Sequence, residues 1–317
     1  MPARPPETPT PTRRTLLAAA AAAIAAAPAR PRPAAAQSAT PLASPFARPP
    51  ARPHPDWLVD PAWVADRQER PNARVVALQP AADFAKGHVP GAVQIDYPAL
   101  DLDDSSTAGL AKWGTATRKR IGELGLAQGQ SIVVYDDGTL FSARLWWVLR
   151  YLGHTEVRML NGGWAAWQAA HGKAATGPAA PVDLGAYRGP TDPRLLAPVT
   201  LVAAAVKAGS AVLVDVRSPQ EYAAGHVPGA VNVPYTDNAD PAPLAVWRPA
   251  ADLSRLYAAA GVTPDRPVIA YCSTGVRSAV TVFTLRMLGY PDVRLFSGSW
   301  REWTADPKRP VTTGPHP

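Results

Sequence analysis

The heptapeptide GHVPGAV occurs twice in this chain of 317 residues, at Gly87–Val93 and at Gly225–Val231, which lie 138 residues apart. Three later pairs recur at an offset of 136: VVYDDGTLFSA (Val133–Ala143) with IAYCSTGVRSA (Ile269–Ala279), LRYLGH (Leu149–His154) with LRMLGY (Leu285–Tyr290), and NGGW (Asn161–Trp164) with SGSW (Ser297–Trp300). This long period is typical of a duplicated domain, with about 115 residues in each copy. The chain is long enough for two domains, each with its own hydrophobic core.

The second copy alternates between strand and helix patterns. Ser210–Val216 and Pro267–Tyr271 are continuous apolar runs, typical of strands buried on both faces. Ser278–Tyr290 has apolar side chains at helical spacing, and Val293–Gly298 begins as a further short strand. Strands that alternate with helices predict an α/β fold, in which each copy is a parallel sheet with helices on both faces. Ligands of such sheets bind beyond the carboxyl ends of the strands.

The N-terminus has the pattern of a targeting signal. TRRTLL (Thr12–Leu17) places paired arginines before an uncharged, Ala-rich run that is too short to span a bilayer, and AAAQ (Ala34–Gln37) offers a cleavage site. The arrangement resembles a bacterial twin-arginine signal. We therefore expect a periplasmic or otherwise exported protein that has no membrane span after the signal is removed. A disordered Ala/Pro-rich tail is the alternative.

These patterns divide the chain into five segments. We expect an export signal at 1–36, a Pro-rich linker at 37–55, an N-terminal domain at 56–174, a second linker at 175–196 and a C-terminal domain at 197–311.

The charge balance argues against a nucleic-acid partner. The formal net charge is +7, but residues 1–36 contain five Arg and one Glu, so the remaining chain carries only +3. The later sequence has no Lys/Arg-rich run with interleaved aromatic residues. The histidine spacing and the single cysteine do not form a metal-site pattern, and we expect neither a metal nor a cofactor.

The single cysteine, Cys272, follows the predicted strand Pro267–Tyr271 and so lies at the sheet edge where ligands bind. Cysteines of exported proteins usually pair, but a single cysteine has no partner within its own chain. A buried inert thiol, a bridge to another chain and a reactive thiol are the three interpretations.

The internal repeat allows the two copies to be compared. Residues present in both copies are expected to serve the fold, whereas residues present in only one copy are candidates for a catalytic role. His226 has the twin His88 in a half without cysteine, which indicates a structural role for both. Cys272 and Arg277 are replaced in the first half by Asp136 and Phe141. The N-terminal domain is therefore predicted to be catalytically inactive.

The loop after Cys272 favours a thiolate. Arg277 supplies a positive charge, a helix predicted to begin near Ser278 directs its N–H groups at the loop, and Gly275 lets the backbone curl. The hydroxyls of Ser273 and Thr274 are expected to add donors. The same loop would hold an anion, so we expect a small anionic substrate with a transferable group and a covalent cysteine adduct.

Two motifs in this two-copy layout carry a family resemblance. DVRSPQEYAAGHVPGA (Asp215–Ala230) and YCSTGVRS (Tyr271–Ser278) resemble the tandem rhodanese-type sulfurtransferases, and the resemblance covers roughly 57–304. It implies that Cys272 takes a sulfane sulfur from a donor such as thiosulfate, holds it as a persulfide and passes it to cyanide or a thiol. The residues implied to bind the persulfide and the donor are Ser273, Thr274, Gly275, Val276 and Arg277.

Departures from the family pattern bear on the donor. Members that prefer 3-mercaptopyruvate usually have a loop ending in Gly-Val-Thr, whereas Arg277 stands here in place of the threonine, which favours thiosulfate. Glu221 stands where some members have an arginine, and we expect it to pair with Arg277 or Arg217. Arg217 is either a second anion contact or the partner of Asp215.

Three alternatives stay open. The first is a 3-mercaptopyruvate sulfurtransferase, with the same chemistry and another donor. The second is a phosphatase or arsenate reductase, although those relatives tend to have one more residue between Cys and Arg than the four found here. The third is a non-catalytic periplasmic sulfur carrier or binding module. A protein acceptor also stays open.

Overall fold

The computed structural model describes residues 53–317 except 69, 181, 183, 184, 186, 242 and 243. The predicted export signal and nearly all of the predicted linker 37–55 therefore lie outside the described residues. Within the described residues, every helix is too short or too polar to cross a membrane.

The first half of the described chain contains a parallel sheet of five strands in the order β1-β5-β4-β2-β3. The strands are β1 (Leu58–Val59), β2 (Ala73–Leu78), β3 (Val93–Ile95), β4 (Ser131–Tyr135) and β5 (Val157–Leu160). The α-helices of this half are α2 (Pro61–Arg67), α3 (Ala81–Lys86), α4 (Thr107–Glu123), α5 (Ser142–Tyr151) and α6 (Gly163–Ala169), and its 3-10 helices are η1 (Pro55–Trp57) and η2 (Tyr97–Leu100).

The second half repeats this arrangement with a parallel sheet in the order β7-β6-β8-β9. The strands are β6 (Val212–Asp215), β7 (Val231–Asn232), β8 (Val268–Tyr271) and β9 (Val293–Leu295). The helices are α7 (Val199–Ala208), α8 (Pro219–Ala224), α9 (Ala250–Ala259), α10 (Ser278–Met287) and α11 (Ser299–Thr304), with the 3-10 helices η3 (Pro193–Leu195) and η4 (Tyr235–Asn238). Leu196 bridges in parallel to Leu295, as β1 pairs with β5 in the first half.

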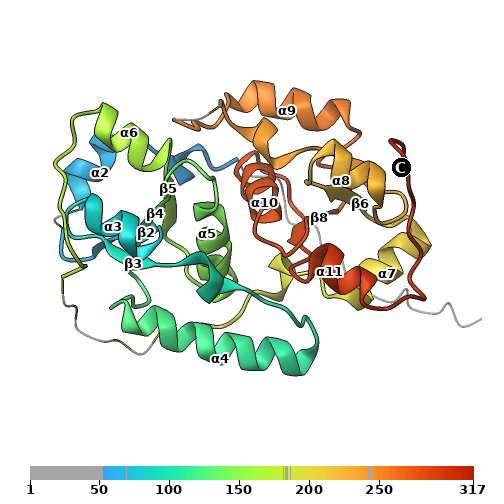
Figure 1. Ribbon diagram of the computed structural model, residues 1–317, viewed down its shortest axis with the longest axis horizontal. Coiled ribbons are helices and arrows are strands. Elements are labelled where there is room, and N and C mark those ends of the chain that lie inside the picture. The colour runs from blue at the N-terminus through green and yellow to red at the C-terminus, as the bar shows by residue number, and fades with distance from the viewer. Residues whose placement is uncertain (1–52, 69, 181, 183–184, 186, 242–243) are drawn as a thin grey trace, which may run out of the picture. The chain divides into compact units, whose positions relative to one another are not determined.

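Each sheet is covered by helices on both faces, because successive strand residues point to opposite sides. In β4, Ile132 and Val134 face a central core with α4 and α5, while Val133 and Tyr135 face an outer core with α2, α3 and α6. In the second half, α9 and α10 join the same central core, and α7, α8 and α11 cover the outer face. Figure 1 shows α5 and α10 side by side, and their side chains pack in this shared core. The predicted α/β fold is confirmed.

The elements predicted in the second half are also confirmed, with shorter ends. β6 and β8 lie inside the two predicted strands and are buried along their whole length. The predicted helix begins at Ser278 as expected but ends at Met287, because Gly289 adopts φ +89° and turns the chain out of the helix.

The repeated histidines have the predicted structural role. The Nδ1 atom of His88 lies 2.8 Å from the carbonyl oxygen of Phe84, and its ring stacks on the phenyl ring. His226 repeats both contacts with Tyr222, at 2.9 Å. Both histidines are buried, so they pack the GHVPGA turn against the preceding helix.

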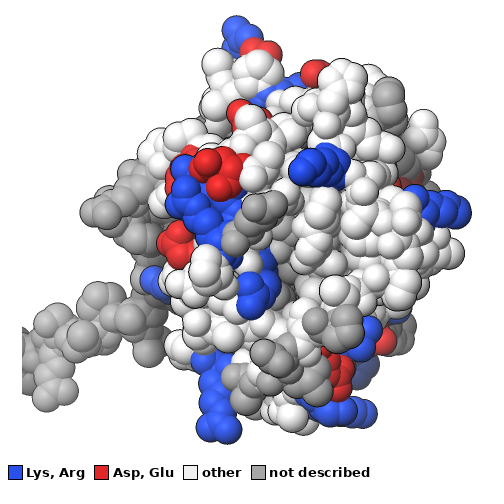
Figure 2. Space-filling model, turned by 90° about the vertical axis from the view of Figure 1, so that its left-hand side faces the viewer, with Lys and Arg blue, Asp and Glu red and all other residues white. Residues whose placement is uncertain are grey.

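Charges of both signs are interspersed on the described residues of the face in Figure 2, which is the left-hand side of Figure 1. Blue groups there are separated by white areas and several lie next to red ones. The ion pairs of the first half include Arg67 and Arg70 with Asp66, and Arg158 with Glu156.

Candidate active site

Cys272 lies in the loop between β8 and α10, at the carboxyl end of a central strand of the second sheet. Its backbone is fixed by two hydrogen bonds. Its N–H donates to Ser299 Oγ at 3.1 Å, and its carbonyl oxygen accepts from the N–H of Trp300 at 3.0 Å. The N-terminal end of α11 therefore holds the cysteine at the edge of the sheet.

Polar donors surround the sulfur atom. The N–H of Gly275 donates to Cys272 Sγ at 3.1 Å, and the hydroxyls of Ser278 and Ser299 lie 3.7 Å and 4.0 Å from it. The Ser299 hydroxyl has one proton, and Phe296 O accepts from it at 2.8 Å, so the closer donors to sulfur are Gly275 and Ser278. Such donors stabilise a thiolate more than a neutral thiol, which accepts weakly.

Gly275 gives the loop its curvature. Its φ is +89°, in the left-handed region that favours glycine, and a Cβ at this position would lie 2.5 Å from the carbonyl oxygen of Ser297. The turn directs the Gly275 N–H at the sulfur. The curling that the sequence predicted for this glycine is confirmed.

The Glu221 carboxylate neutralises the loop cation. Arg277 donates from its two terminal nitrogens to the two Glu221 oxygens, each at 2.8 Å, in a bidentate ion pair. This bond, opposed by partial burial, lowers the pKa of Glu221 to about 2, and it raises the pKa of Arg277. The predicted pairing of Glu221 with Arg277 is confirmed.

Ser273 belongs to this ion pair, which differs from the expectation that its hydroxyl faces the sulfur. Its Oγ accepts from Arg277 at 2.7 Å and lies 3.4 Å from Glu221. A hydroxyl that joins a charged pair forms charge-assisted hydrogen bonds, which are stronger than hydrogen bonds between neutral groups. Thr274 is partly exposed and Val276 is buried under the start of α10.

Arg217 is the partner of Asp215. Three hydrogen bonds of 2.6–3.1 Å join the guanidinium to the carboxylate, and a further bond of 2.6 Å runs to Gly225 O. Both side chains are buried, and the guanidinium lies 4.7 Å from the Trp300 ring centroid. This pair supports the end of β6, and the ion-pair interpretation of Arg217 is the one the structure supports.

Ser299 is a site residue that the sequence reasoning missed. It is fully buried and adopts φ +55°, which is uncommon for a residue with a side chain. Its twin in the first half is Gly163, which has the same φ. The repeat could have indicated this residue, because the C-terminal half has a serine where the N-terminal half has a glycine.

The first half carries a loop that holds a true anion at the position of the sulfur. The Asp136 carboxylate accepts from the N–H groups of Gly138 at 2.8 Å, Thr139 at 3.0 Å and Ser142 at 2.6 Å. Thr139 is the twin of Gly275, whose N–H donates to Cys272 Sγ. The same loop geometry therefore binds a negative charge in one half and the sulfur in the other.

Cys272 is 1% exposed, so its sulfur lies beneath the surface of the loop. It touches the central core on one side and the polar donors on the other. Ser273, Thr274 and Arg277 are partly exposed above it. No three His, Cys, Asp or Glu side chains of the described residues gather closely enough to hold a metal ion.

Fold and site together define a class: an α/β protein with two copies of one domain, the second of which holds a cysteine in an anion-binding loop. The family model of the rhodanese-like domain matches the chain twice, at residues 60–170 and 199–306. The chain belongs to the rhodanese family, as its motifs predicted.

Curated relatives align along nearly their whole length. The chain is 31% identical over 277 residues to the 3-mercaptopyruvate sulfurtransferase of Escherichia coli K12, covering 80% of this chain and 97% of the relative. It is 34% identical over 267 residues to the thiosulfate sulfurtransferase of Pseudomonas aeruginosa, covering 80% and 96%. The crystal structure of SseA from Escherichia coli, described as a 3-mercaptopyruvate sulfotransferase with the rhodanese fold, matches with a TM-score of 0.69 at 30% identity, covering 77% of this chain and 98% of that one.

Proposed function

We propose that this protein is a thiosulfate sulfurtransferase that carries a sulfane sulfur on Cys272. The observation that carries the proposal is the sulfur's environment, in which the Gly275 N–H donates to it in a loop whose twin binds the Asp136 carboxylate. Relatives named thiosulfate sulfurtransferase, at 33–34% identity, support the same chemistry.

The proposed reaction has two half-reactions. The Cys272 thiolate attacks the outer sulfur of thiosulfate and forms a persulfide, while the sulfur–sulfur bond of the donor breaks and its electron pair leaves with sulfite. Cyanide or a thiolate then attacks the outer sulfur of the persulfide, and thiocyanate or a new persulfide leaves as the Cys272 thiolate is regenerated. Charge and electrons balance in each step, and no cofactor is needed.

The loop residues have distinct proposed roles. Ser273, Thr274 and Arg277, which are partly exposed, would contact the oxygens of the donor. The N–H of Gly275 would stabilise the negative sulfur in the thiolate and persulfide states, and Val276 would keep the base of the loop dry.

A steady-state assay tests the proposal. The purified chain and its Cys272→Ser variant are assayed for thiocyanate formation from thiosulfate and cyanide. We expect turnover in the natural chain and a loss of at least about a thousandfold in the variant, since the nucleophile is removed. Equal rates in the two proteins would refute the mechanism.

A specific observation favours a second donor. The Glu221 carboxylate occupies both terminal nitrogens of Arg277, which reduces the attraction of the loop for a dianion such as thiosulfate. The attraction of the loop for a singly charged donor such as 3-mercaptopyruvate is reduced less. Parallel assays decide between the donors: a kcat/KM for 3-mercaptopyruvate far above that for thiosulfate would reverse their order. Persulfide formation on Cys272 without turnover would instead identify a sulfur carrier.

We further propose that the chain is exported through its twin-arginine-type signal. The support is the sequence TRRTLL before an uncharged Ala-rich run and the AAAQ cleavage pattern. Fractionation of cells that express the full chain, with an Arg13→Lys/Arg14→Lys variant as control, tests this. Mature protein near Gln37 in the exported fraction is expected, and equal cytoplasmic retention of both proteins would contradict it.

A further inference from the structure

A buried arginine of the N-terminal half lies beside the loop of the C-terminal half. Arg144, in the first turn of α5, is 0% exposed. Its two terminal nitrogens donate to Ser297 Oγ at 3.1 Å and to Leu100 O at 2.7 Å, and its guanidinium lies 4.8 Å from the Trp147 ring centroid. Of its polar atoms, Nε has no hydrogen-bond partner among the described residues.

This guanidinium is a cation held away from water. Burial lowers the pKa of Arg144 to about 10, and the negative charges of Asp101 and of the Cys272 thiolate oppose that effect. Arg144 therefore keeps its charge at neutral pH. Such a desolvated cation is costly unless negative charge lies nearby, and Asp101 and an ionised Cys272 are the groups that can supply it.

Ser297 connects Arg144 to the loop. It is fully buried directly after the buried Phe296, and Gly275 packs against it so closely that a Cβ there would meet Ser297 O at 2.5 Å and Ser297 Oγ at 3.0 Å. The same Gly275 donates its N–H to the sulfur. The contacts thus run from Arg144 through Ser297 to Gly275 and then to Cys272.

The repeat shows that this chain of contacts belongs to the C-terminal site alone. The position of Arg144 is occupied in the second half by Val280, whose side chain carries no charge. The twin of Ser297 is Asn161, whose Oδ1 accepts from the N–H of Trp247 in the other half at 2.9 Å. This mirror contact between Asn161 and Trp247 also joins the two halves, but neither of its groups is charged.

We propose that Arg144 is a positioning residue of the C-terminal site: through Ser297 it fixes the segment on which Gly275 rests, and its buried positive charge favours the anionic forms of Cys272. The proposal deepens the proposed function and rests on it where those forms include the persulfide. The N-terminal half then takes part in the chemistry, although its own loop has no nucleophile.

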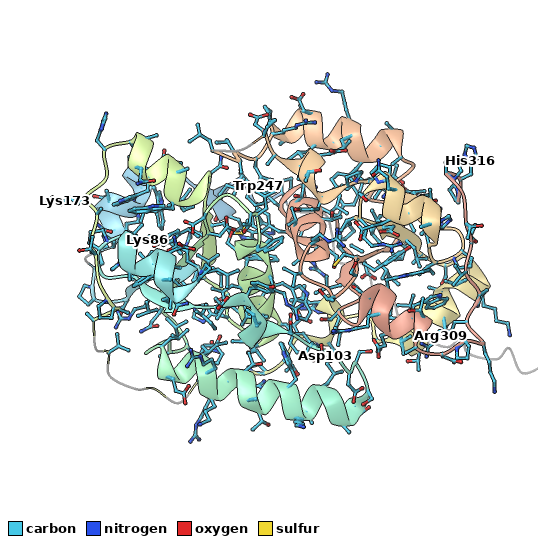
Figure 3. All side chains as sticks on the ribbon, viewed as in Figure 1. Lys86, Asp103, Lys173, Trp247, Arg309 and His316 are labelled. Atoms are coloured by element: carbon cyan, nitrogen blue, oxygen red, sulfur yellow. The ribbon has the colours of Figure 1, made fainter. Side chains whose placement is uncertain are left out.

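The elements that pack near the loop of Cys272 carry other charged groups, and most of these have partners of their own. They are Arg277 with Glu221 of α8, Arg217 with Asp215 of β6, Glu302 of α11 with the Ser105 hydroxyl, and Asp101 of the segment that contacts Arg144. Asp103 of this segment, labelled in Figure 3, also forms an ion pair with Arg301 of α11.

The test is the pH dependence of Cys272 alkylation by iodoacetamide, combined with steady-state kinetics. In Arg144→Met, which keeps the apolar stem of the side chain and removes its charged end, we expect the alkylation midpoint to rise by about one pH unit. We expect kcat to fall about tenfold while KM for thiosulfate changes far less, because the donor does not touch Arg144. Arg144→Lys restores the charge and should recover part of the midpoint shift.

Two matched controls separate this role from a purely structural one. Asn161→Ala removes the mirror contact between the halves, and Arg150→Met removes another arginine of α5 that contacts Trp57 and Trp146. Both should lower the melting temperature and leave the alkylation profile unchanged. Ser297→Ala, in contrast, should shift the profile in the direction of Arg144→Met.

Three outcomes decide the proposal. An Arg144→Met profile that matches the natural chain or the two controls would overturn it. If Arg144→Met does not fold, Ser297→Ala decides: an unchanged profile overturns the proposal and an upward shift supports it. Should the natural chain transfer no sulfur, the proposed function fails, but the alkylation profile still tests whether Arg144 favours the thiolate.

Discussion

Asp136 and Cys272 occupy the same position in the two halves, and both are held by backbone N–H groups of the loop that follows. The carboxylate accepts from three such groups, and the sulfur accepts from the twin of one of them. The loop is therefore an anion-binding device of the fold. In the N-terminal half this loop binds the carboxylate of Asp136. In the C-terminal half it holds the sulfur of Cys272, which we propose as the nucleophile.

Asp136→Ala should destabilise the N-terminal half without affecting sulfur transfer. It would leave three N–H groups without their acceptor in a buried place, at a cost of about 2–3 kcal/mol. Urea unfolding measures the loss. Asp136→Asn keeps one acceptor oxygen and should lose less. Stability equal to that of the natural chain in Asp136→Ala would show that this loop needs no anion.

Gly275→Ala should damage the C-terminal site and the fold together. The left-handed φ and the contact with Ser297 O combine to an expected loss of about 3 kcal/mol or more. Gly229→Ala is the matched control, because its φ is +75° and a Cβ there meets nothing within 4 Å. It should lose only about 1–2 kcal/mol. Equal losses in the two variants would count against the tight packing of the loop on Ser297.

Glu221→Gln should change how stability depends on pH. Because the folded pKa of Glu221 is about 2, below its ordinary value of 4.5, its contribution is complete above 4.5 and is lost as the pH falls towards 2. The natural chain should therefore melt higher than the variant near pH 6, and the difference should shrink below pH 4.5. Glu156→Gln, at the exposed pair with Arg158, is the control.

Glu221→Gln should also change the KM for the sulfur donor. Removing the carboxylate frees Arg277 for a dianion, so KM for thiosulfate should fall several-fold in Glu221→Gln. A melting difference between the natural chain and Glu221→Gln that does not vary with pH would contradict the expected pH dependence of stability. A raised KM would show that the ion pair itself holds the loop ready for the donor.

Access to the sulfur should depend on reagent size. Since Cys272 is 1% exposed, a small reagent such as methyl methanethiosulfonate should modify the folded protein much faster than the bulky Ellman reagent. In guanidinium the two rates should approach those of a free thiol. A folded protein that reacts with both reagents at free-thiol rates would contradict the buried position.

The sequence predicted those features that depend on local chemistry. The repeat, the buried runs of β6 and β8 and the start of α10 at Ser278 follow from apolar periodicity and turn residues. The left-handed Gly275 and the pairing of Glu221 with Arg277 were likewise expected from residue type and charge.

Other features that depend on contacts through space were not predicted. Ser299 lies 27 residues after Cys272 and reaches it only because α11 begins beside the end of β8. Arg144 comes from the other half, and nothing in its helical neighbourhood indicates Ser297 as its partner. The depth of Cys272 was also missed, because burial depends on how the loop packs rather than on its polar composition.

The proposed sulfur transfer requires that the sulfur of Cys272 accepts and releases a sulfane sulfur. Intact-protein mass spectrometry after incubation with thiosulfate, before and after cyanide is added, tests it most directly. We expect the chain to gain the mass of one sulfur atom, located on Cys272 by peptide mapping, and to lose it to cyanide as thiocyanate appears. An unmodified Cys272 in a folded protein, with thiosulfate in excess, would show that Cys272 does not carry sulfur from this donor.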